Sequence, residues 1–124
     1  MIKAFRKEFT LEQRIRDSNA ILSKHPDRVP VIIDSKDQQL LQLIKKRKFL
    51  VPRDISASYL LVTIRNKIKL NSSKALFMFA DDSMINGTTI IGEVYEEYKD
   101  RNKLHGIGQD KFFYITIAYE TTFG

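Results

Sequence analysis

The chain has 124 residues, a length that suits one domain with a single core. Hydrophobic residues make up 43% of it and charged residues 29%, a balance that excludes a wholly disordered chain and a fibrous repeat. Lysine and arginine exceed aspartate and glutamate by 21 to 15, and the resulting net charge of +6 favours acidic partners, whether nucleic acid, acidic peptides or anionic lipid.

The absence of cysteine excludes disulfides, thiolate catalysis and cysteine-ligated metals. The first residues, MIKAFRKEF, contain no apolar stretch long enough for a signal peptide. No other run approaches the roughly 18 apolar residues that a membrane span needs. We therefore expect a cytoplasmic protein.

Two helical pieces are expected before the first strand. Thr10 and the glutamine three residues later have the spacing of a capping box, so a helix should begin at Leu11. It should end near Lys24, because Pro26 disfavours helical geometry in the residue before it. Residues 2–9 are long enough for a short helix of their own.

Two strands should follow these helices. Residues 28–34 (RVPVIID) are rich in β-branched side chains, and Pro30 suits the beginning of a strand because it cannot donate to the ladder. Residues 45–52 (KKRKFLVP) resume a strand pattern that ends at Pro52. The polar residues 35–45 between them predict a connection with little regular structure.

A long helix and a third strand come next. Ser56 can cap a helix whose apolar residues repeat at four-residue spacing from Leu60 to Ile68. Residues 75–80 (ALFMFA) predict a buried strand, although their periodicity alone does not exclude a buried helical turn. Asn86 and the glycine after it are a strong turn signal.

The remaining residues predict a short helix and a last strand. Apolar residues spaced from Ile91 to Tyr98 indicate an amphipathic helix that finishes before the polar stretch starting at Lys99. Residues 112–119 (FFYITIAY) have the composition of a central strand. The order of elements is typical of an α+β fold, with the β-β-α-β-β outline of a β-grasp and a four-stranded mixed sheet packed on helices.

Several segments are distinctive together and occur in order along nearly the whole chain: KHPDRVPVI (24–32), KKRKFLVPRDI (45–55), IRNKIKL (64–70), ALFMF (75–79), GEVYEEYKD (92–100), FFYITIAY (112–119) and the terminal FG. In these segments the chain resembles the autophagy-related ubiquitin-like modifiers. That family includes the microtubule-associated light chains and the GABA-receptor-associated protein.

The resemblance implies a ubiquitin-like core with two added N-terminal helices. Residues 1–26 would form the helical extension, residues 27–119 the ubiquitin-like domain and residues 120–124 a flexible C-terminal tail. It further implies a protein that needs no cofactor and is not an enzyme but a substrate. Family members lie in the cytoplasm and, when lipidated, on the autophagosome membrane, where they recruit cargo receptors.

Gly124 is the residue to which the resemblance assigns chemistry. In the family the terminal glycine is activated with ATP, passed between cysteine thioesters of activating and conjugating enzymes, and joined to phosphatidylethanolamine. A cysteine protease trims precursors or removes the lipid, and microtubules are a further implied partner. A residue without a Cβ suits entry into a narrow channel, although a chain can also end in glycine by coincidence. The tail from Ala118 is shorter than is usual in the family.

Residues 48–51 are expected to bind peptides. Alternate side chains of a strand point to opposite faces, so Lys48 and Leu50 would face one way, and Phe49 and Val51 the other. If this strand is an edge, an extended peptide can add to it. The resemblance implies peptides with an aromatic, two intervening residues and an aliphatic, preceded by acidic residues. It places Asp17, Ile21, Pro30, Ile32, Lys48, Leu50 and Tyr114 in one pocket, and Phe49, Val51, Pro52, Ile55, Leu60, Thr63 and Ile64 in a second.

Other residues complete the expected site. Arg28, Lys46 and Lys48 would attract the acidic flank of the peptide. The resemblance further implies that Phe77 and Phe79 contact the processing and activating enzymes. Tyr114 and Thr63 depart from the family, which commonly has phenylalanine and a larger aliphatic there. From spacing alone, the apolar residues of both pockets, and at least one of the two phenylalanines, indicate core packing.

Two other classes of function remain as alternatives. Net charge and the run KKRK suit a small nucleic-acid-binding module, but we find no RNA-binding signature, zinc spacing or helix-turn-helix pattern. An enzyme is disfavoured because no nucleophile-base pair or metal cluster can be named. His25 and His105 have no partner spacing that suggests a metal or a triad.

Overall fold

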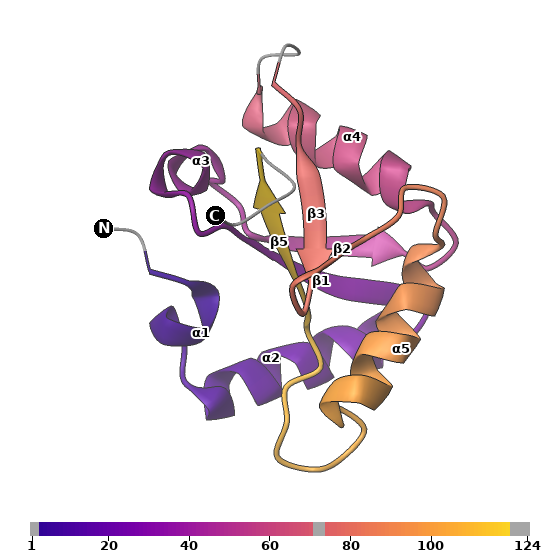
Figure 1. Ribbon diagram of the computed structural model, residues 1–124. Helices are drawn as coiled ribbons and strands as arrows, with labels where there is room; N and C mark the ends of the chain where they lie inside the picture. The colour runs from indigo at the N-terminus through magenta and orange to yellow at the C-terminus, as the bar shows by residue number, and fades with distance from the viewer. Residues whose placement is uncertain (1–2, 71–73, 120–124) are drawn as a thin grey trace.

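A computed structural model describes residues 3–70 and 74–119, with a mixed sheet at the centre and helices on both of its faces (Figure 1). The strand order is β2-β1-β5-β3-β4. The helices are α1 (Phe5–Glu8), α2 (Leu11–Lys24), α3 (Gln38–Leu43), α4 (Ala57–Ile68) and α5 (Ile91–Asn102), and the strands are β1 (Arg28–Asp34), β2 (Lys48–Pro52), β3 (Phe77–Ala80), β4 (Ser83–Met84) and β5 (Phe113–Ala118).

Local sequence signals account for the starts of α2 and α4. The Thr10 side chain accepts a hydrogen bond from Gln13 N, and the Gln13 side chain accepts one from Thr10 N, so the predicted capping box starts α2. Ser56 caps α4 by accepting from Tyr59 N. The two N-terminal helices, the first two strands and the last strand are confirmed close to their expected positions.

The sheet joins segments that are far apart in the chain. Strand β1 pairs antiparallel with β2 and parallel with β5, while β3 pairs antiparallel with β5. Strand β5 is therefore central, as predicted, and Phe113, Ile115 and Ile117 on one of its faces are fully buried. Strand β2 forms an edge.

Each face of the sheet has its own core. The larger core includes Val31 and Ile115 from the sheet, Leu40 from α3, Ile64 from α4 and Tyr95 from α5. The smaller core, on the other face, contains Phe5, Ile32 and Phe112, with Ile21 of α2 and Tyr114 packed against it. Helices α1 and α2 therefore cover one face, and α3, α4 and α5 the other.

Three sequence-based expectations need correction. Residues 35–45 contain α3, because the Asp37 carboxylate accepts from Gln39 N and Leu40 N and the leucines of the segment reach the core. Helix α5 continues to Asn102 and is closed by Lys103 in the left-handed conformation. The described sheet has a fifth strand, the short β4, which pairs with β3 after a turn at Asp81 and Asp82 with positive φ.

No helix in the described ranges is long and apolar enough to cross a membrane.

Candidate functional site

Strand β2 meets the main condition for peptide addition, since it lies at the end of the sheet and, among the described strands, has β1 as its single neighbour. Ile33 N donates to Arg47 O at 2.9 Å, and the register continues with Val31 opposite Phe49 and Val29 opposite Val51. Hydrogen-bonded and non-hydrogen-bonded pairs alternate along an antiparallel ladder.

The alternation settles which backbone groups of β2 face outward. Counting from the bond to Arg47, the groups of Phe49 and Val51 point towards β1. The N–H and C=O groups of Lys48 and Leu50 therefore point away from the sheet. A peptide strand placed alongside β2 would find its hydrogen-bond partners at these two residues.

The residues expected in the first pocket gather on the face covered by α2. Leu50 lies opposite Pro30, and Lys48 opposite Ile32, which in turn pairs with Tyr114 on β5. The Lys48 ammonium forms an ion pair with Asp17 of α2. Ile32 is fully buried and Pro30 buried, whereas Leu50 is 39% exposed, so Leu50 presents the most accessible apolar surface among these residues of the sheet.

The residues expected in the second pocket divide into two groups. Val51, Leu60 and Ile64 are buried in the larger core, as the core-packing alternative for these positions predicts. The others are only partly buried and leave surface that a ligand can contact: Phe49, Pro52, Ile55 and Thr63. The Thr63 hydroxyl donates to Tyr59 O at 3.0 Å, so the helix itself satisfies this polar group.

The expected basic residues differ in how they are engaged. Lys46 is exposed and Arg28 half-buried, and neither forms an ion pair with any residue for which the structure is described. Lys48 is already paired with Asp17. An acidic peptide could therefore form ion pairs with Lys46 and Arg28 directly, whereas at Lys48 it would compete with Asp17.

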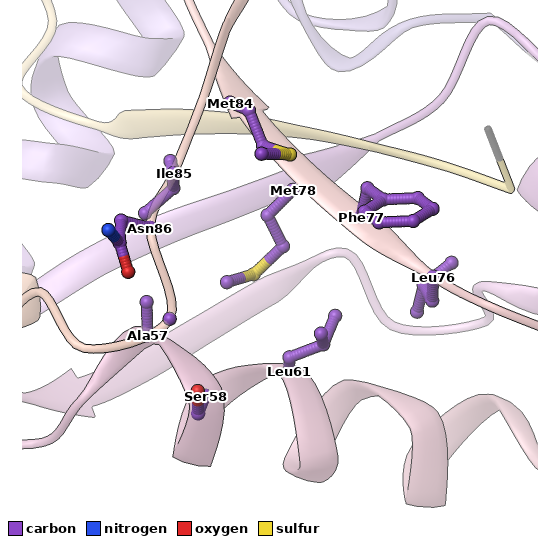
Figure 2. Close-up of a pocket in the computed structure, with 10 residues that line it drawn as sticks. Ala57, Ser58, Leu61, Leu76, Phe77, Met78, Met84, Ile85 and Asn86 are labelled. Carbon is purple, nitrogen blue, oxygen red and sulfur yellow. The ribbon is translucent and has the colours of Figure 1, made fainter. Parts of the chain in front are cut away.

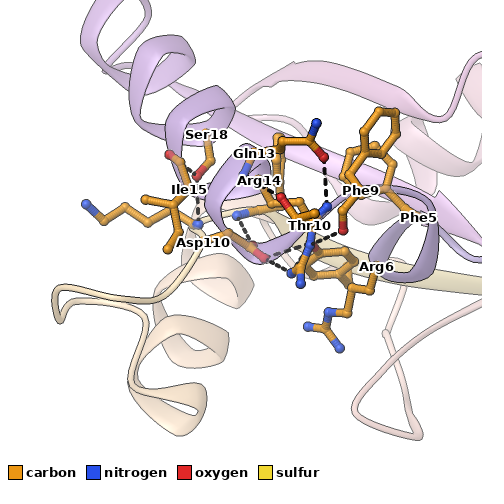
Figure 3. Close-up of polar contacts among 12 residues, drawn as sticks. Phe5, Arg6, Phe9, Thr10, Gln13, Arg14, Ile15, Ser18 and Asp110 are labelled. Carbon is orange, nitrogen blue, oxygen red and sulfur yellow. Dashed lines mark hydrogen bonds and ion pairs between the residues drawn. The ribbon is translucent and has the colours of Figure 1, made fainter.

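A buried carboxylate beneath this face was not anticipated from the sequence. Asp110 is 5% exposed, pairs with Arg14 of α2, accepts from the Tyr114 hydroxyl at 2.9 Å and accepts from Phe112 N at 3.1 Å (Figure 3). Burial raises the pKa of Tyr114 to about 12, so its hydroxyl stays protonated and can donate its hydrogen bond to Asp110. No signal in the local sequence QDKFF indicates that this acid is buried.

Two further contacts fasten the N-terminal segment to the same face. The Arg6 guanidinium lies 3.8 Å from the centroid of the Tyr114 ring, in cation–π geometry. The Ser18 hydroxyl accepts from Lys111 N at 3.0 Å, which ties α2 to the loop before β5. The Tyr114 side chain, which is expected to line the first pocket, is thus contacted by residues of α1, of α2 and of the loop before β5.

Helix α1 is also held by an ion pair at the end of β1. Arg47 Nη2 lies 3.0 Å from Asp34 Oδ1, while Arg47 Nη1 donates to Lys3 O at 2.6 Å. The other Asp34 oxygen accepts from Phe5 N at 3.4 Å. Asp34 Oδ1 and Arg47 Nη2 are buried without a well-aligned hydrogen bond to a described residue. Burial accordingly raises the pKa of Asp34 despite the attraction of Arg47.

Phe77 and Phe79 lie on one face of β3, but their surroundings differ. Phe79 is 4% exposed and therefore belongs to the interior, as expected for at least one of the two. Phe77 is half-buried and lines a cavity of about 560 Å³ between α4 and β3 (Figure 2). Leu61, Met78 and Met84 contribute to the same cavity.

Gly124 and the rest of the expected tail, residues 120–124, lie outside the described residues. Among those that are described, no group of three or more histidine, aspartate or glutamate side chains is arranged to hold a metal ion. His105 lies beyond the end of α5 and contacts the carboxylate of Asp100 in the last turn of that helix.

Comparison with known proteins identifies similar chains over the full length. The model of a family described as "Autophagy protein Atg8 ubiquitin like" matches residues 13–124. Autophagy-related protein 8 of Schizosaccharomyces pombe is 36% identical over 124 residues, which cover 100% of this chain and 96% of that protein. Autophagy-related protein 8D of Oryza sativa subsp. japonica is 34% identical over 122 residues, 98% of each chain. The crystal structure of Trypanosoma brucei ATG8 matches with a TM-score of 0.77 at 27% identity and covers all of both chains.

Proposed function

We propose, from the premise that the chain belongs to the Atg8 family of ubiquitin-like autophagy proteins, that it acts as a lipid-conjugated adaptor. In this proposal Gly124 is joined to phosphatidylethanolamine, and the folded domain then captures short peptides along β2. The protein performs no catalysis itself and is the substrate of activating and conjugating enzymes. A cysteine protease would supply or reverse the modified form.

The free edge of β2 is the observation that supports peptide capture most directly. Lys48 and Leu50 direct their backbone groups outward and their side chains towards the α2 face. One peptide residue can therefore form main-chain hydrogen bonds to β2 while its side chain lies over Leu50. Phe49 on the opposite face can receive the next anchor, since alternate residues of a strand point to opposite sides.

Charge favours peptides with an acidic flank. Lys46 and Arg28 lie at the two ends of the β1-β2 pair and carry no ion pair within the described chain. An exposed pair contributes only about 0 to 1 kcal/mol. These residues would therefore increase the association rate and the selectivity more than the affinity.

The lipid step depends on the family match at Gly124. Activation with ATP would convert the carboxylate to an acyl-adenylate, a mixed anhydride, with release of pyrophosphate. The thiolate of an enzyme cysteine would then attack the acyl carbon and displace AMP to form a thioester. The amine of phosphatidylethanolamine then attacks the thioester carbonyl, forms an amide and releases the thiol. We place the conjugated protein on the autophagosome membrane and the unconjugated protein in the cytoplasm. Within it, residues 1–26 would be an extension fastened to the domain of residues 27–119.

Reconstitution tests this function. The full chain would be incubated with activating and conjugating enzymes of a related system, ATP and vesicles that contain phosphatidylethanolamine. A faster-migrating, membrane-bound form that requires ATP is the expected result. Failure with an enzyme set that conjugates its own substrate would remove the modifier role and leave a peptide-binding protein.

A further inference from the structure

The positive charge of this chain is unevenly distributed. From Ile55 to Ala80 the sequence contains no aspartate or glutamate, whereas it contains Arg65, Lys67, Lys69 and Lys74. These four bases, which we call the basic end, come from the last turn of α4, its C-cap and the segment before β3. No other region of the chain has comparable length and no acid.

The basic end is accessible and lies beside the end of β5. Lys67, Lys69 and Lys74 are exposed, and none of the three forms an ion pair with a residue of the described ranges. Arg65 Nη1 donates to Lys74 O at 2.7 Å, which joins the helix to the segment before β3. Lys74 Nζ lies 5.4 Å from the centroid of the Tyr119 ring. In Figure 1 the arrow of β5 points to the same end of the molecule as the end of α4.

We propose that the basic end contacts the anionic headgroups of a lipid bilayer. The inference rests on the proposed function, because attachment at Gly124 limits how far this surface can lie from the membrane. Four residues lie between Tyr119 and Gly124, so the five Cα–Cα steps that join them span at most about 17 Å. A lipid-attached protein therefore holds Tyr119 and the neighbouring Lys74 within about two Debye lengths of the headgroups at physiological salt.

The outer face of α4 supports a membrane as the partner. Tyr59 and Val62 are 64% and 55% exposed, and with Asn66 and Lys69 they form a stripe at helical spacing. A helix face on which exposed aromatic and aliphatic side chains are followed by lysines suits the interface between headgroups and acyl chains. The helix macrodipole favours bases in the last turn of α4, but it does not account for Lys74, which lies beyond the helix.

The basic end would act as a second membrane-binding element beside the lipid anchor. One lipid anchor and a polybasic surface bind a membrane more firmly together than either does alone. Each lysine near an anionic surface increases binding about fivefold. The basic end would thus orient the conjugated domain with β5 and α4 towards the membrane and retain it on anionic bilayers.

Vesicle binding by the unconjugated full chain tests this inference without any enzyme. The chain would be sedimented with phosphatidylcholine vesicles with and without phosphatidylserine, at low salt and at about 1 M salt, where the Debye length is about 3 Å. Binding should require phosphatidylserine and disappear at high salt. The triple variant Lys67→Gln/Lys69→Gln/Lys74→Gln should bind about a hundredfold more weakly.

A variant of equal net charge provides the control. Lys7, Lys45 and Lys46 are also exposed, but they lie on α1 and before β2. Their replacement by glutamine should reduce vesicle binding less than about tenfold if position matters as well as charge. Thermal melting of both variants would establish that they are folded.

Three outcomes would overturn the proposal. Equal losses in the two variants would mean that net charge alone governs binding. Equal binding to vesicles with and without phosphatidylserine would remove the electrostatic basis. Absence of vesicle binding, together with binding of a poly(U) strand that the first variant loses, would assign the surface to nucleic acid. None of these results affects conjugation at Gly124, which is tested separately by the enzyme reconstitution.

Discussion

Leu50 lies directly opposite Pro30 in the antiparallel pair of β2 with β1, at a position where the two residues share no backbone hydrogen bond. Proline has no N–H to donate, so this position tolerates it without loss to the ladder. The same geometry directs the backbone groups of Leu50 away from the sheet. One register therefore explains both a proline in β1 and the outward polar groups of β2.

Replacing Lys48 and Leu50 by alanine should weaken capture of acidic-flanked, aromatic-x-x-aliphatic peptides by about thirtyfold. Loss of the Leu50 contact and of one exposed charge accounts for about 2 kcal/mol. Titration calorimetry with such a peptide would measure the change. Leu43 is 40% exposed, close to the 39% of Leu50, so Lys45→Ala with Leu43→Ala is a matched control. Equal binding to a peptide without both anchors would refute the pocket assignment.

The edge position of β2 illustrates what the sequence could and could not predict. Alternation in KKRKFLVP and the proline at its end predicted the strand and the two faces correctly. Its place at the edge of the sheet depends on the pairing of β1 with β5. These strands are about 80 residues apart, so their pairing cannot be recognised from a local sequence pattern. Spacing likewise could not separate buried Ile64 from half-buried Phe49, because both are apolar residues next to the same core.

Asp110 marks a second limit of sequence-based prediction. Its partners Arg14 and Tyr114 are brought to it by tertiary packing, and nothing in QDKFF distinguishes a buried acid from an exposed one. Helix α3 was missed for a related reason. So short a helix is stabilised by its Asp37 cap and by the docking of Leu40 and Leu41 on the core, and the docking leaves no periodic signal in the sequence.

Substitution of Gly124 by alanine should abolish conjugation to phosphatidylethanolamine, since a Cβ would obstruct entry of the terminal carboxylate into a narrow enzyme channel. A gel-mobility assay in the reconstituted system would show the loss, and urea unfolding should show unchanged stability. Gly106→Ala is the control, because a Cβ there has no heavy atom nearer than 3.9 Å. Efficient conjugation of the Gly124 variant would contradict the role of the terminal residue.

Asp110→Ala should destabilise the protein by about 3 kcal/mol, because it leaves the Arg14 guanidinium, with a side chain only 12% exposed, without its partner. Tyr114→Phe removes one hydroxyl from the same network and should cost about 1 kcal/mol. Chemical denaturation of the three proteins would measure both effects. Similar losses in the two variants would show that the ion pair with Arg14 adds nothing to the phenol's hydrogen bond.

Asp34 and Glu96 should contribute to stability with opposite dependence on pH. Burial raises the pKa of Asp34, so the folded state binds its proton more tightly than the unfolded state does. Its contribution to the free energy of unfolding is therefore greatest below the ordinary carboxyl pKa of about 4 and is lost as pH rises through the raised value. For Glu96, burial acts to raise the pKa, but hydrogen bonds from Arg53 and Lys99 outweigh it and lower the pKa.

The contribution of Glu96 is accordingly present above about pH 4.3 and lost as pH falls through the lowered pKa. Urea unfolding of the wild type, Asp34→Asn and Glu96→Gln from acid to neutral pH would separate the two. The stability advantage of the wild type over Asp34→Asn should shrink as pH rises, whereas its advantage over Glu96→Gln should grow. If both advantages grew with pH, the Arg47 charge would outweigh burial at Asp34, and the N-terminal helix would be held by an ordinary ion pair.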